Sequence, residues 1–436
     1  MSKDTSLTAI DIGSDKITTL IAVIDQTTSQ LRIVGSASVA SSGVIKSAIV
    51  DLESVLRCVE QSLNAAERMA GFGVQKAFVS LAGDHVRSQN STGVVAVANP
   101  DKEIVETDVA RVIEATRAVS LPPDREIVHV IPRYFKVDSQ AGIRDPVHMT
   151  GVRLETEAHL ITASSSALRN ISKCLNDLGI GVEGFVFSAL AAADVCLTET
   201  EKELGVVLCD IGAGTTSYAA YVDGAIAYSG SIPIGARHIT QDIALGCRID
   251  REVAEQIKLY LSLRGVERIK PLPGESKKDF VRRQKSADTL NLAEVGLPDL
   301  KEELSRIQIV KGIIYPRVQE IVGLLGEILD KHHLLKLVPA GVVFTGGGAM
   351  TIHLNEVAER VLGLPARVGK PRAVDGLIAE ANLTTLATSL GVLNYAKSLG
   401  SGDAVVSRFN LIEAIKDLHL DRVTTKGLSI IKKILP

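Results

Sequence analysis

The stretch VVLCDIGAGTTSYAAYVDG, residues 206–224, consists of two apolar segments joined by a short turn of small residues. The first apolar segment ends at Asp210, and two glycines follow it. A second stretch, LTAIDIGSDKITTLIAVID at residues 7–25, places Asp11 in the same local pattern. Two copies of one strand–turn–strand unit, about two hundred positions apart, indicate an internal duplication. They predict an α/β protein with two similar lobes.

Both turns have a composition that suits phosphate binding. Small residues let backbone N–H groups approach phosphate oxygens, and Thr215 and Thr216 add hydroxyl donors while Lys16 adds a positive charge. A carboxylate beside a phosphate is repelled unless a cation lies between them. Asp11 and Asp210 therefore predict Mg²⁺, held through its water ligands. The simpler alternative is that each Asp-Ile-Gly segment is a β-turn closed by the aspartate side chain.

A third glycine segment favours a nucleotide site over two plain turns. In GVVFTGGGAM, residues 341–350, a buried strand leads into Gly346, Gly347 and Gly348, which suit backbone contact with a nucleotide. A helix after these glycines would present its N-terminus to the ligand. Glu255 and Lys258 lie on neighbouring turns of one predicted helix, where a plain surface ion pair is the alternative.

Hydrophobic periodicity places most other elements. It predicts strands within 7–40, a helix at 51–70, a strand at 76–83, and helices at 107–119, 167–180 and 309–332. Residues 86–163 differ in character from their surroundings and read as an insert, with short strands and a proline-bearing loop at 121–132. The hydrophilic run 264–299 is either a mobile loop or a partner surface.

Composition narrows the class of protein. A chain of 436 residues is expected to form two to four domains. A net charge of −3 and the absence of Trp give no reason to expect a nucleic-acid partner. The five cysteines show no metal spacing and predict buried, reduced thiols of a cytosolic protein. No signal peptide and no membrane-spanning stretch are expected.

The last residues, KGLSIIKKILP at 426–436, form an amphipathic pattern after a polar, linker-like stretch at 398–425. Five aliphatic residues share one face of the predicted helix and the polar residues share the other: Leu428, Ile430, Ile431, Ile434 and Leu435 against Lys426, Ser429, Lys432 and Lys433. Such a helix can lie in a membrane interface with its lysines toward anionic lipids. The alternative is a helix packed on the body of the protein.

Several segments together carry a family resemblance. AIDIGSDKI (9–17), VVLCDIGAGTTSYAAY (206–221) and VVFTGGGAM (342–350) resemble the nucleotide motifs of the actin/Hsp70/sugar-kinase superfamily. GVIKSAIVDLESV (43–55), AERMAGFGV (66–74), IGARHITQDIA (234–244) and the long stretch 121–162 resemble, more narrowly, the FtsA family of bacterial division proteins. The resemblance covers residues 7 to 397 and implies the actin-like duplicated fold.

The resemblance also implies a division of the chain. Subdomain 1A would comprise 1–85, 164–198 and 373–397, and the inserted α+β subdomain 1C would comprise 86–163. Subdomain 2A would comprise 199–234 and 307–372, and 2B would comprise 235–306. The tail after 397 would be a flexible linker and a membrane-targeting helix.

Site residues follow where the family motifs match. The resemblance implies a first phosphate loop of Asp11, Gly13, Ser14 and Lys16, and a second of Asp210, Gly212, Gly214, Thr215 and Thr216. It places Glu255 and Lys258 at the ribose and adenine, with Gly346, Gly347, Gly348 and Met350 closing the base site. ATP and Mg²⁺ are the implied ligands. The implied partners are further copies of the chain, the C-terminal peptide of FtsZ, anionic lipids and other division proteins.

Three departures from the family pattern predict slow ATP hydrolysis at most. Asp15 adds a second negative charge to the first loop, and Ser188 stands where relatives carry a Glu or Gln able to position water. Ala236 and Arg237 replace a glycine and a polar or acidic residue. A pilus-assembly actin homologue and a kinase or polyphosphatase of the same superfamily remain the alternative functions.

Overall fold

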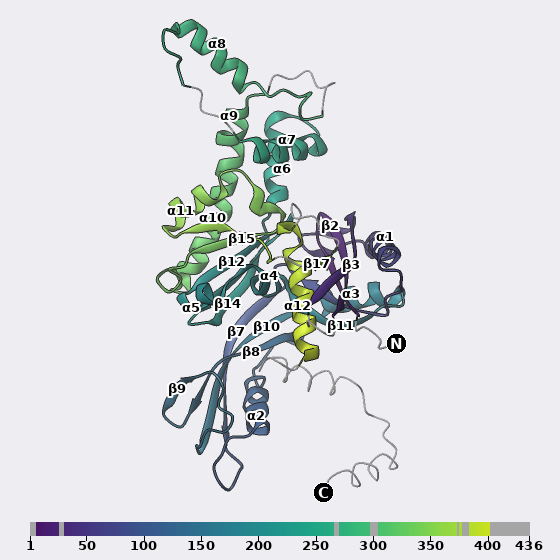
Figure 1. Ribbon diagram of the computed structural model, residues 1–436, viewed down its shortest axis with the longest axis vertical. Helices are drawn as coiled ribbons and strands as arrows, with labels where there is room; N and C mark the ends of the chain where they lie inside the picture. The colour runs from purple at the N-terminus through teal and green to yellow at the C-terminus, as the bar shows by residue number, and fades with distance from the viewer. Residues whose placement is uncertain are drawn as a thin grey trace.

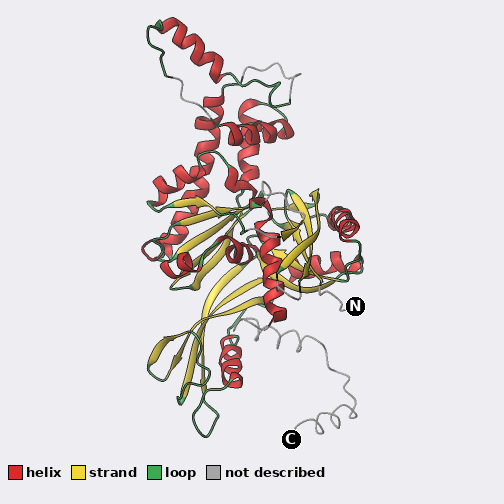
Figure 2. Ribbon diagram, viewed as in Figure 1, coloured by secondary structure: helices red, strands yellow, loops and turns green. Residues whose placement is uncertain are grey.

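The computed structural model describes residues 6–25, 30–265, 270–296, 304–372, 375–376 and 383–401. Two lobes lie side by side in the middle of a long molecule (Figure 1). A strand-rich extension leaves one end, and a helical extension leaves the other (Figure 2). The predicted membrane helix at 426–436 and all but the first four residues of the predicted linker at 398–425 lie outside the described residues.

Each lobe is built on a sheet that contains one aspartate turn. The first sheet has the order β11-β6-β1-β2-β3-β17, with β1 (Ser6–Ile12), β2 (Lys16–Ile24), β3 (Leu31–Ala40), β6 (Lys76–Leu81), β11 (Gly181–Phe187) and β17 (Asp375–Gly376). The second has the order β14-β13-β12-β15-β16, with β12 (Val206–Ile211), β13 (Thr216–Val222), β14 (Ala225–Ile232), β15 (Val342–Thr345) and β16 (Ala366–Val368).

The two sheets repeat one arrangement of strands. In the first lobe β1 pairs antiparallel with β2 and parallel with β6. In the second lobe β12 pairs antiparallel with β13 and parallel with β15. Asp11 pairs with Thr18 and Asp210 with Ser217, so both aspartates stand one residue before the end of the first strand of a hairpin. The predicted duplication into two similar α/β lobes is confirmed.

The helices of the first lobe pack on both faces of its sheet. They are α1 (Leu52–Ala70), α3 (Ser165–Asp177) and α12 (Ala387–Ser401), whereas α4 (Ser188–Cys196) and the short α5 (Glu199–Leu204) contact strands of the second sheet, and α4 also packs on α12. The Asp51 carboxylate accepts a hydrogen bond from the Ser54 N–H at 3.2 Å and begins α1, and Gly71, in a left-handed conformation, ends it. The predicted start of the linker, residue 398, lies inside α12.

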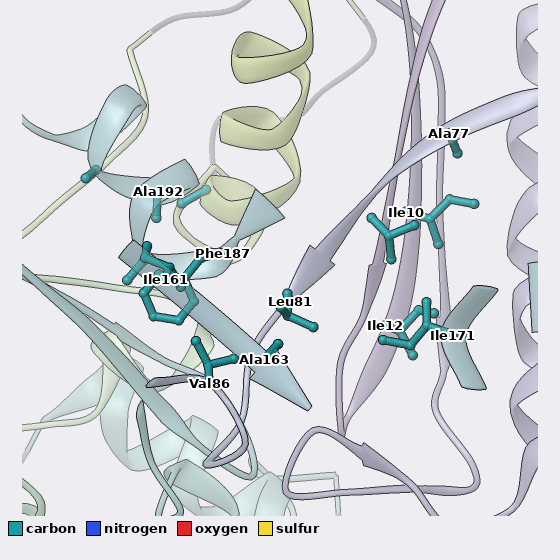
Figure 3. Close-up of a cluster of buried hydrophobic side chains, with 14 of the residues drawn as sticks. Ile10, Ile12, Ala77, Leu81, Val86, Ile161, Ala163, Ile171, Phe187 and Ala192 are labelled. Atoms are coloured by element: carbon teal, nitrogen blue, oxygen red, sulfur yellow. The ribbon is translucent and has the colours of Figure 1, made fainter. Parts of the chain in front are cut away.

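One core lies between the α1/α3 side of the first sheet and the neighbouring elements. Ile12 of the sheet lies near Ile171 of α3, Leu81 lies near Ala163 of β10, and Ile161 lies near Phe187 (Figure 3). Val206 and Leu208 of the second lobe belong to the same cluster. The two lobes therefore share a continuous hydrophobic core.

Between residues 236 and 362 the described helices belong to the second lobe. They are α6 (Ala236–Cys247), α7 (Arg251–Arg264), α8 (Lys277–Asp288), α9 (Arg306–Ile309), α10 (Tyr315–Lys331) and α11 (Leu354–Leu362). A single π-helical turn, Val310–Ile314, joins α9 to α10. Pro316 stands in the first turn of α10, directly after the π-helical turn.

The insert is a four-stranded sheet, ordered β7-β10-β8-β9, with one helix packed on it. Its elements are β7 (Arg87–Ala96), α2 (Glu106–Thr116), β8 (Arg125–Val137), β9 (Gln140–Ile143) and β10 (Arg153–Ser164). The expectations of short strands and of a loop at 121–132 are wrong, because β8 is 13 residues long and begins at Arg125. Pro132 is tolerated because it pairs with Ala158 at an irregularity in the register, where ladder hydrogen bonding is interrupted.

The hydrophilic run 264–299 contains a helix that sequence analysis missed. Helix α8 has no buried residue and extends away from the second lobe (Figure 1). The Asp279 N–H donates to Ser276 Oγ at 3.1 Å, and the Ser276 hydroxyl donates to the Asp279 carboxylate at 2.6 Å. This Ser-x-x-Asp pattern was the available signal for a helix start.

Candidate functional site

The first aspartate turn is closed tightly on itself. The Gly13 N–H donates to the Lys16 carbonyl at 3.1 Å, and a Cβ on Gly13 would lie 2.8 Å from that oxygen. Ser14 is buried at the tip of the turn. Asp11 accepts a hydrogen bond from the Ser80 hydroxyl on the neighbouring strand β6. Burial raises the pKa of the Asp11 carboxyl, and the Ser80 hydrogen bond and the charge of Lys16 offset part of that rise.

The second turn has the same construction. The Gly212 N–H donates to the Thr215 carbonyl at 2.9 Å, and Asp210 accepts a hydrogen bond from Thr388 Oγ1 of α12 at 2.9 Å. Burial raises the pKa of Asp210 to about 6, and the negative charge of Asp11 contributes to the rise. The two carboxylates thus lie close enough to interact. A Cβ on Gly214 of the second turn would lie 2.7 Å from Ser14 Oγ of the first, so the two turns face each other, one from each lobe.

Ser188, at the start of α4, lies beside the second turn. Its buried hydroxyl makes no hydrogen bond of normal geometry to the residues that the structure describes. It is nevertheless near enough to favour the charged form of Asp210 and so to lower the pKa of that carboxyl. A hydroxyl in this position is too short to act as a carboxylate base would.

The third glycine segment packs directly on the second turn. Gly346 has a φ of 81°, and a Cβ there would clash with the Asp210 carboxylate and the Ile211 carbonyl. A Cβ on Gly348 would clash with the Ile211 side chain, whereas Gly347 has open space around it. The expected helix does not follow at once, because residues 347–350 form a single 3₁₀ turn and α11 begins only at Leu354.

Glu255 and Lys258 form an ion pair, and the alternative of a plain surface pair does not describe it. Lys258 Nζ lies 2.7 Å from the Glu255 carboxylate and only 7% of Lys258 is exposed. Thr240 of α6 donates to Glu255 and accepts from Lys258 at 2.9 Å, which ties α6 to α7. Buried lysines require such partners, so this trio is a fixed part of the second lobe.

Helix α6 connects this trio to the second turn. The backbone N–H groups of Ala236 and Arg237 donate to the carbonyls of Gly212 and Ala213 at 2.9 and 2.8 Å. The Arg237 side chain reaches the other lobe, where its guanidinium lies 3.3 Å from the Asp15 carboxylate. Asp15 and Arg237, which depart separately from the expected pattern, therefore pair with each other across the lobes.

Sequence reasoning did not identify all the groups at this site. Ser80 and Thr388 hydrogen-bond the two aspartates, and the Lys46–Ser47 turn contacts both loops. Ser80 and Thr388 come from a strand and a helix far away in the chain. Neither hydroxyl belongs to a recognisable motif, so only the fold brings these residues to the site.

The chemistry of the two aspartates suits a divalent cation. Both residues keep some solvent exposure, yet surrounding protein raises both pKa values. Among the described residues, neither carboxylate forms an ion pair and no group of three or more His, Cys, Asp or Glu could ligate a metal directly. A cation held by water and phosphate oxygens would stabilise their charged forms.

The predicted membrane residues are not part of this geometry. Seven of them were named from sequence and lie outside the described residues: Leu428, Ile430, Ile431, Lys432, Lys433, Ile434 and Leu435. Among the helices of the described part, none is long and apolar enough to cross a membrane.

Comparison with known proteins identifies relatives along most of the chain. Two family models match: the SHS2 domain inserted in FTSA, at residues 83–162, and the cell division protein FtsA, at residues 207–391. Cell division protein FtsA of Pseudomonas aeruginosa is 35% identical over 389 residues, covering 89% of this chain and 88% of that protein. FtsA of Bacillus subtilis is 35% identical over 374 residues, covering 86% and 80%.

Solved structures agree on the fold. The PilM–PilN type IV pilus biogenesis complex superposes with a TM-score of 0.58 at 14% identity, covering 90% of this chain and 98% of that one. MreB5 of Spiroplasma citri bound to ADP gives a TM-score of 0.50 at 15% identity, covering 91% and 98%. The actin-like two-lobed fold is therefore confirmed. With relatives this similar over nearly its whole length, the chain belongs to the FtsA family of cell division proteins.

Proposed function

We propose that the chain binds Mg-ATP between its two lobes. The observation that carries this proposal is the facing pair of aspartate turns, whose carboxylates interact and have raised pKa values. Gly13, Ser14, Lys16, Gly212, Gly214, Thr215 and Thr216 would hold the phosphates, and Asp11 and Asp210 would hold Mg²⁺ through its water ligands. Glu255, Lys258, Gly346, Gly347, Gly348 and Met350 would surround the nucleoside. The structures of MreB5 with ADP and with AMPPNP support this assignment at the level of the fold.

Hydrolysis at this site is expected to be slow. An ATPase needs a group that orients the attacking water, and a carboxylate or amide usually performs this role. The Ser188 hydroxyl beside Asp210 is a poor substitute because it is short and has one proton to donate. ATP would then act chiefly as a structural ligand that controls assembly.

The cellular role that we propose is that of the FtsA family. The chain would polymerise on the inner face of the cytoplasmic membrane and attach the FtsZ ring to it during division. The amphipathic pattern at 426–436 supports membrane attachment. One such helix is about 16 Å long and binds weakly. A filament that carries many of them would bind tightly through effective concentration.

Within the second lobe, the exposed helix α8 is the surface that we propose for the FtsZ peptide. Five basic residues lie on α8: Lys277, Lys278, Arg282, Arg283 and Lys285. Arg283 is already engaged, since its guanidinium pairs with the Glu275 carboxylate at 2.7 Å and donates to the Lys270 carbonyl at 2.8 Å. We propose that the other four, on this exposed helix, attract an acidic peptide.

Titration calorimetry tests the nucleotide site. Asp210→Ala is expected to weaken Mg-ATP binding at least tenfold, because it removes the group that holds the cation. Asp223→Ala, at the tip of the β13–β14 hairpin, serves as a matched control and should bind normally. Unchanged affinity in Asp210→Ala would refute the proposed site.

Vesicle sedimentation tests the tail separately. Removal of residues 426–436 is expected to abolish ATP-dependent binding to anionic vesicles while Mg-ATP affinity is retained. Co-sedimentation of the truncated chain would place the anchor elsewhere.

A further inference from the structure

A two-residue turn that no motif singled out touches both phosphate loops. Lys46 and Ser47 connect the short strands β4 (Val44–Ile45) and β5 (Ala48–Ile49) of the first lobe. Their φ angles are 49° and 62°, a left-handed pair that two-residue hairpins usually build with Asn-Gly. Residues other than glycine adopt this conformation where surrounding contacts impose it.

Those contacts come from the two aspartate turns. The Ser47 N–H donates to Ser14 Oγ of the first turn at 2.9 Å. The Ser47 hydroxyl lies 3.0 Å from the Thr215 hydroxyl of the second turn. A Cβ on Gly214 would come 2.9 Å from the Lys46 Cα, so only glycine allows this approach without displacement. One residue, Ser47, thus hydrogen-bonds to a loop of each lobe.

The hydrogen-bond directions favour phosphate as the ligand. Ser14 Oγ accepts from the Ser47 backbone, which leaves the Ser14 proton available for another acceptor. In the Ser47–Thr215 pair one hydroxyl donates to the other, so one proton again remains available. Ser14 and Thr215 are both at least 95% buried, so their orientation is restricted. Phosphate oxygens are pure acceptors and match donors prepared in this way.

The base of the hairpin is rigid enough to hold that orientation. The Gly43 carbonyl accepts hydrogen bonds from the N–H groups of Val50 and Asp51 at 2.8 and 3.2 Å. Val44 is buried in the core of the first lobe, and Asp51 is the N-cap of α1. The turn is therefore fixed to the body of its own lobe while its tip contacts the other.

We propose that the Lys46–Ser47 turn is a third phosphate-positioning segment, which aims the Ser14 and Thr215 hydroxyls at the polyphosphate of a bound nucleoside triphosphate. Ser47 is a positioning residue, because it acts through Ser14 and Thr215. This inference rests on the proposed Mg-ATP site and deepens it. It also makes nucleotide affinity depend on a contact between the lobes.

Calorimetry with Mg-ATP tests the inference through two substitutions of one residue. Ser47→Ala and Ser47→Gly both remove the hydroxyl and keep the N–H, but glycine also relieves the left-handed φ. Each is expected to weaken Mg-ATP binding about fivefold to tenfold, the effect of one lost hydrogen bond. Ser47→Gly should melt at an equal or higher temperature than the wild type without nucleotide. A purely structural role would instead make affinity follow melting temperature.

A double-mutant cycle shows whether Ser47 acts through Thr215. In the Thr215→Ala background, Ser47→Ala is expected to cost less than about twofold in affinity. Ser42→Ala, an exposed serine before the hairpin, is the matched control and should bind as the wild type does. Unchanged affinity in Ser47→Ala, or fully additive losses in the cycle, would overturn this inference but leave the proposed Mg-ATP site standing. Absence of Mg-ATP binding by the wild type would overturn the proposed function as well.

Discussion

Asp210 meets two opposing requirements. The proposed binding of Mg²⁺ needs its carboxylate charged, whereas burial and the neighbouring charge of Asp11 raise its pKa to about 6. An ordinary aspartate in the unfolded chain ionises near 3.8. Above that pH the unfolded state releases its proton first, so the folded state loses relative stability as pH rises toward 6. The charged Asp210 therefore lowers the stability of the folded chain at neutral pH, a cost that the proposed cation would offset.

Asp210→Asn should relieve this cost. We expect its free energy of unfolding at pH 7, without nucleotide, to exceed that of the wild type by about 1–3 kcal/mol. The difference should shrink as the pH falls below 6, because the wild-type carboxyl becomes neutral in the folded state. Urea unfolding at pH 7 and pH 4.5 measures both quantities. A variant less stable than the wild type at pH 7 would contradict this account.

Asp15 should weaken nucleotide binding in the wild type. Its pairing with Arg237 is mostly exposed, with 67% of the Asp15 side chain and 34% of the Arg237 side chain open to solvent. Such pairs contribute little to stability, between 0 and about 1 kcal/mol. A negative charge in the first loop, however, repels the predicted phosphates.

Asp15→Asn is accordingly expected to tighten Mg-ATP binding about threefold to tenfold, with melting temperature nearly unchanged. Asp101→Asn, on the insert, removes the same charge at a distance and should leave the affinity as it is. Weaker binding by Asp15→Asn would mean that Asp15 helps to hold the cation instead.

At the scale of single elements, α8 illustrates local stability without a core. None of its residues is buried, so its helical structure depends on its cap and on the Arg283–Glu275 pair. Ser276→Ala should weaken the helix by about 1 kcal/mol, since it removes the N-cap. Amide hydrogen exchange within 277–288 should then accelerate while the global melting temperature stays constant. Ser286→Ala, in the exposed interior of the same helix, should slow that exchange because alanine is the better helix former.

The elements differ in how well their sequences predict them. Strands β1, β2 and β15 and helix α1 were predictable because apolar runs, an Asp N-cap and a C-terminal glycine act locally. Strand β8 was missed because Pro132 suggests a loop, and only pairing with β10 shows that the proline is accommodated. The residues around Pro132 do not indicate which strand pairs with β8, so they cannot show that the proline is accommodated.

The candidate site divides in the same way. Asp11, Asp210 and the glycines could be predicted because they belong to repeated motifs. Ser47 could not be predicted in this way. Neither it nor Lys46 is of a residue type that is typical of a left-handed turn, and the hydrogen-bond partners of Ser47 lie far away in the chain. The ion pair between Asp15 and Arg237 joins residues more than two hundred positions apart. Contacts of this kind depend on how the two lobes are placed against each other, which no local pattern reports.

On the scale of the whole molecule, two buried histidines fasten the insert to both lobes. His129 of β8 accepts the Phe187 N–H of the first lobe at 3.0 Å. His159 of β10 lies 2.6 Å from Asn90 Oδ1 and 2.9 Å from Ser229 Oγ of the second lobe. Burial lowers the pKa of His129 to about 4 and that of His159 to about 3. Both rings are therefore neutral in the folded protein at physiological pH.

Acid should loosen this connection. Below about pH 6.5 the unfolded histidines gain protons that the folded ones do not, so stability falls as the pH decreases toward 4. Each histidine contributes a slope of up to about 1.4 kcal/mol per pH unit, and Asp210 acts in the opposite direction between 6 and 3.8.

Urea unfolding at pH 6.5 and 5.0 measures that slope. His159→Gln, neutral at both values, should reduce it relative to the wild type. Equal slopes in the wild type and His159→Gln would show that His159 becomes protonated without unfolding.

The direction of α12 decides at which end of the long molecule the described chain finishes. This helix runs from the lobes toward the insert, and α8 extends the opposite way (Figure 1). Any attachment made by residues beyond Ser401 therefore begins on the insert's side. A membrane held close to that end would lie nearer to the insert than to α8. A soluble partner would then reach α8 without competing with lipid for the same face.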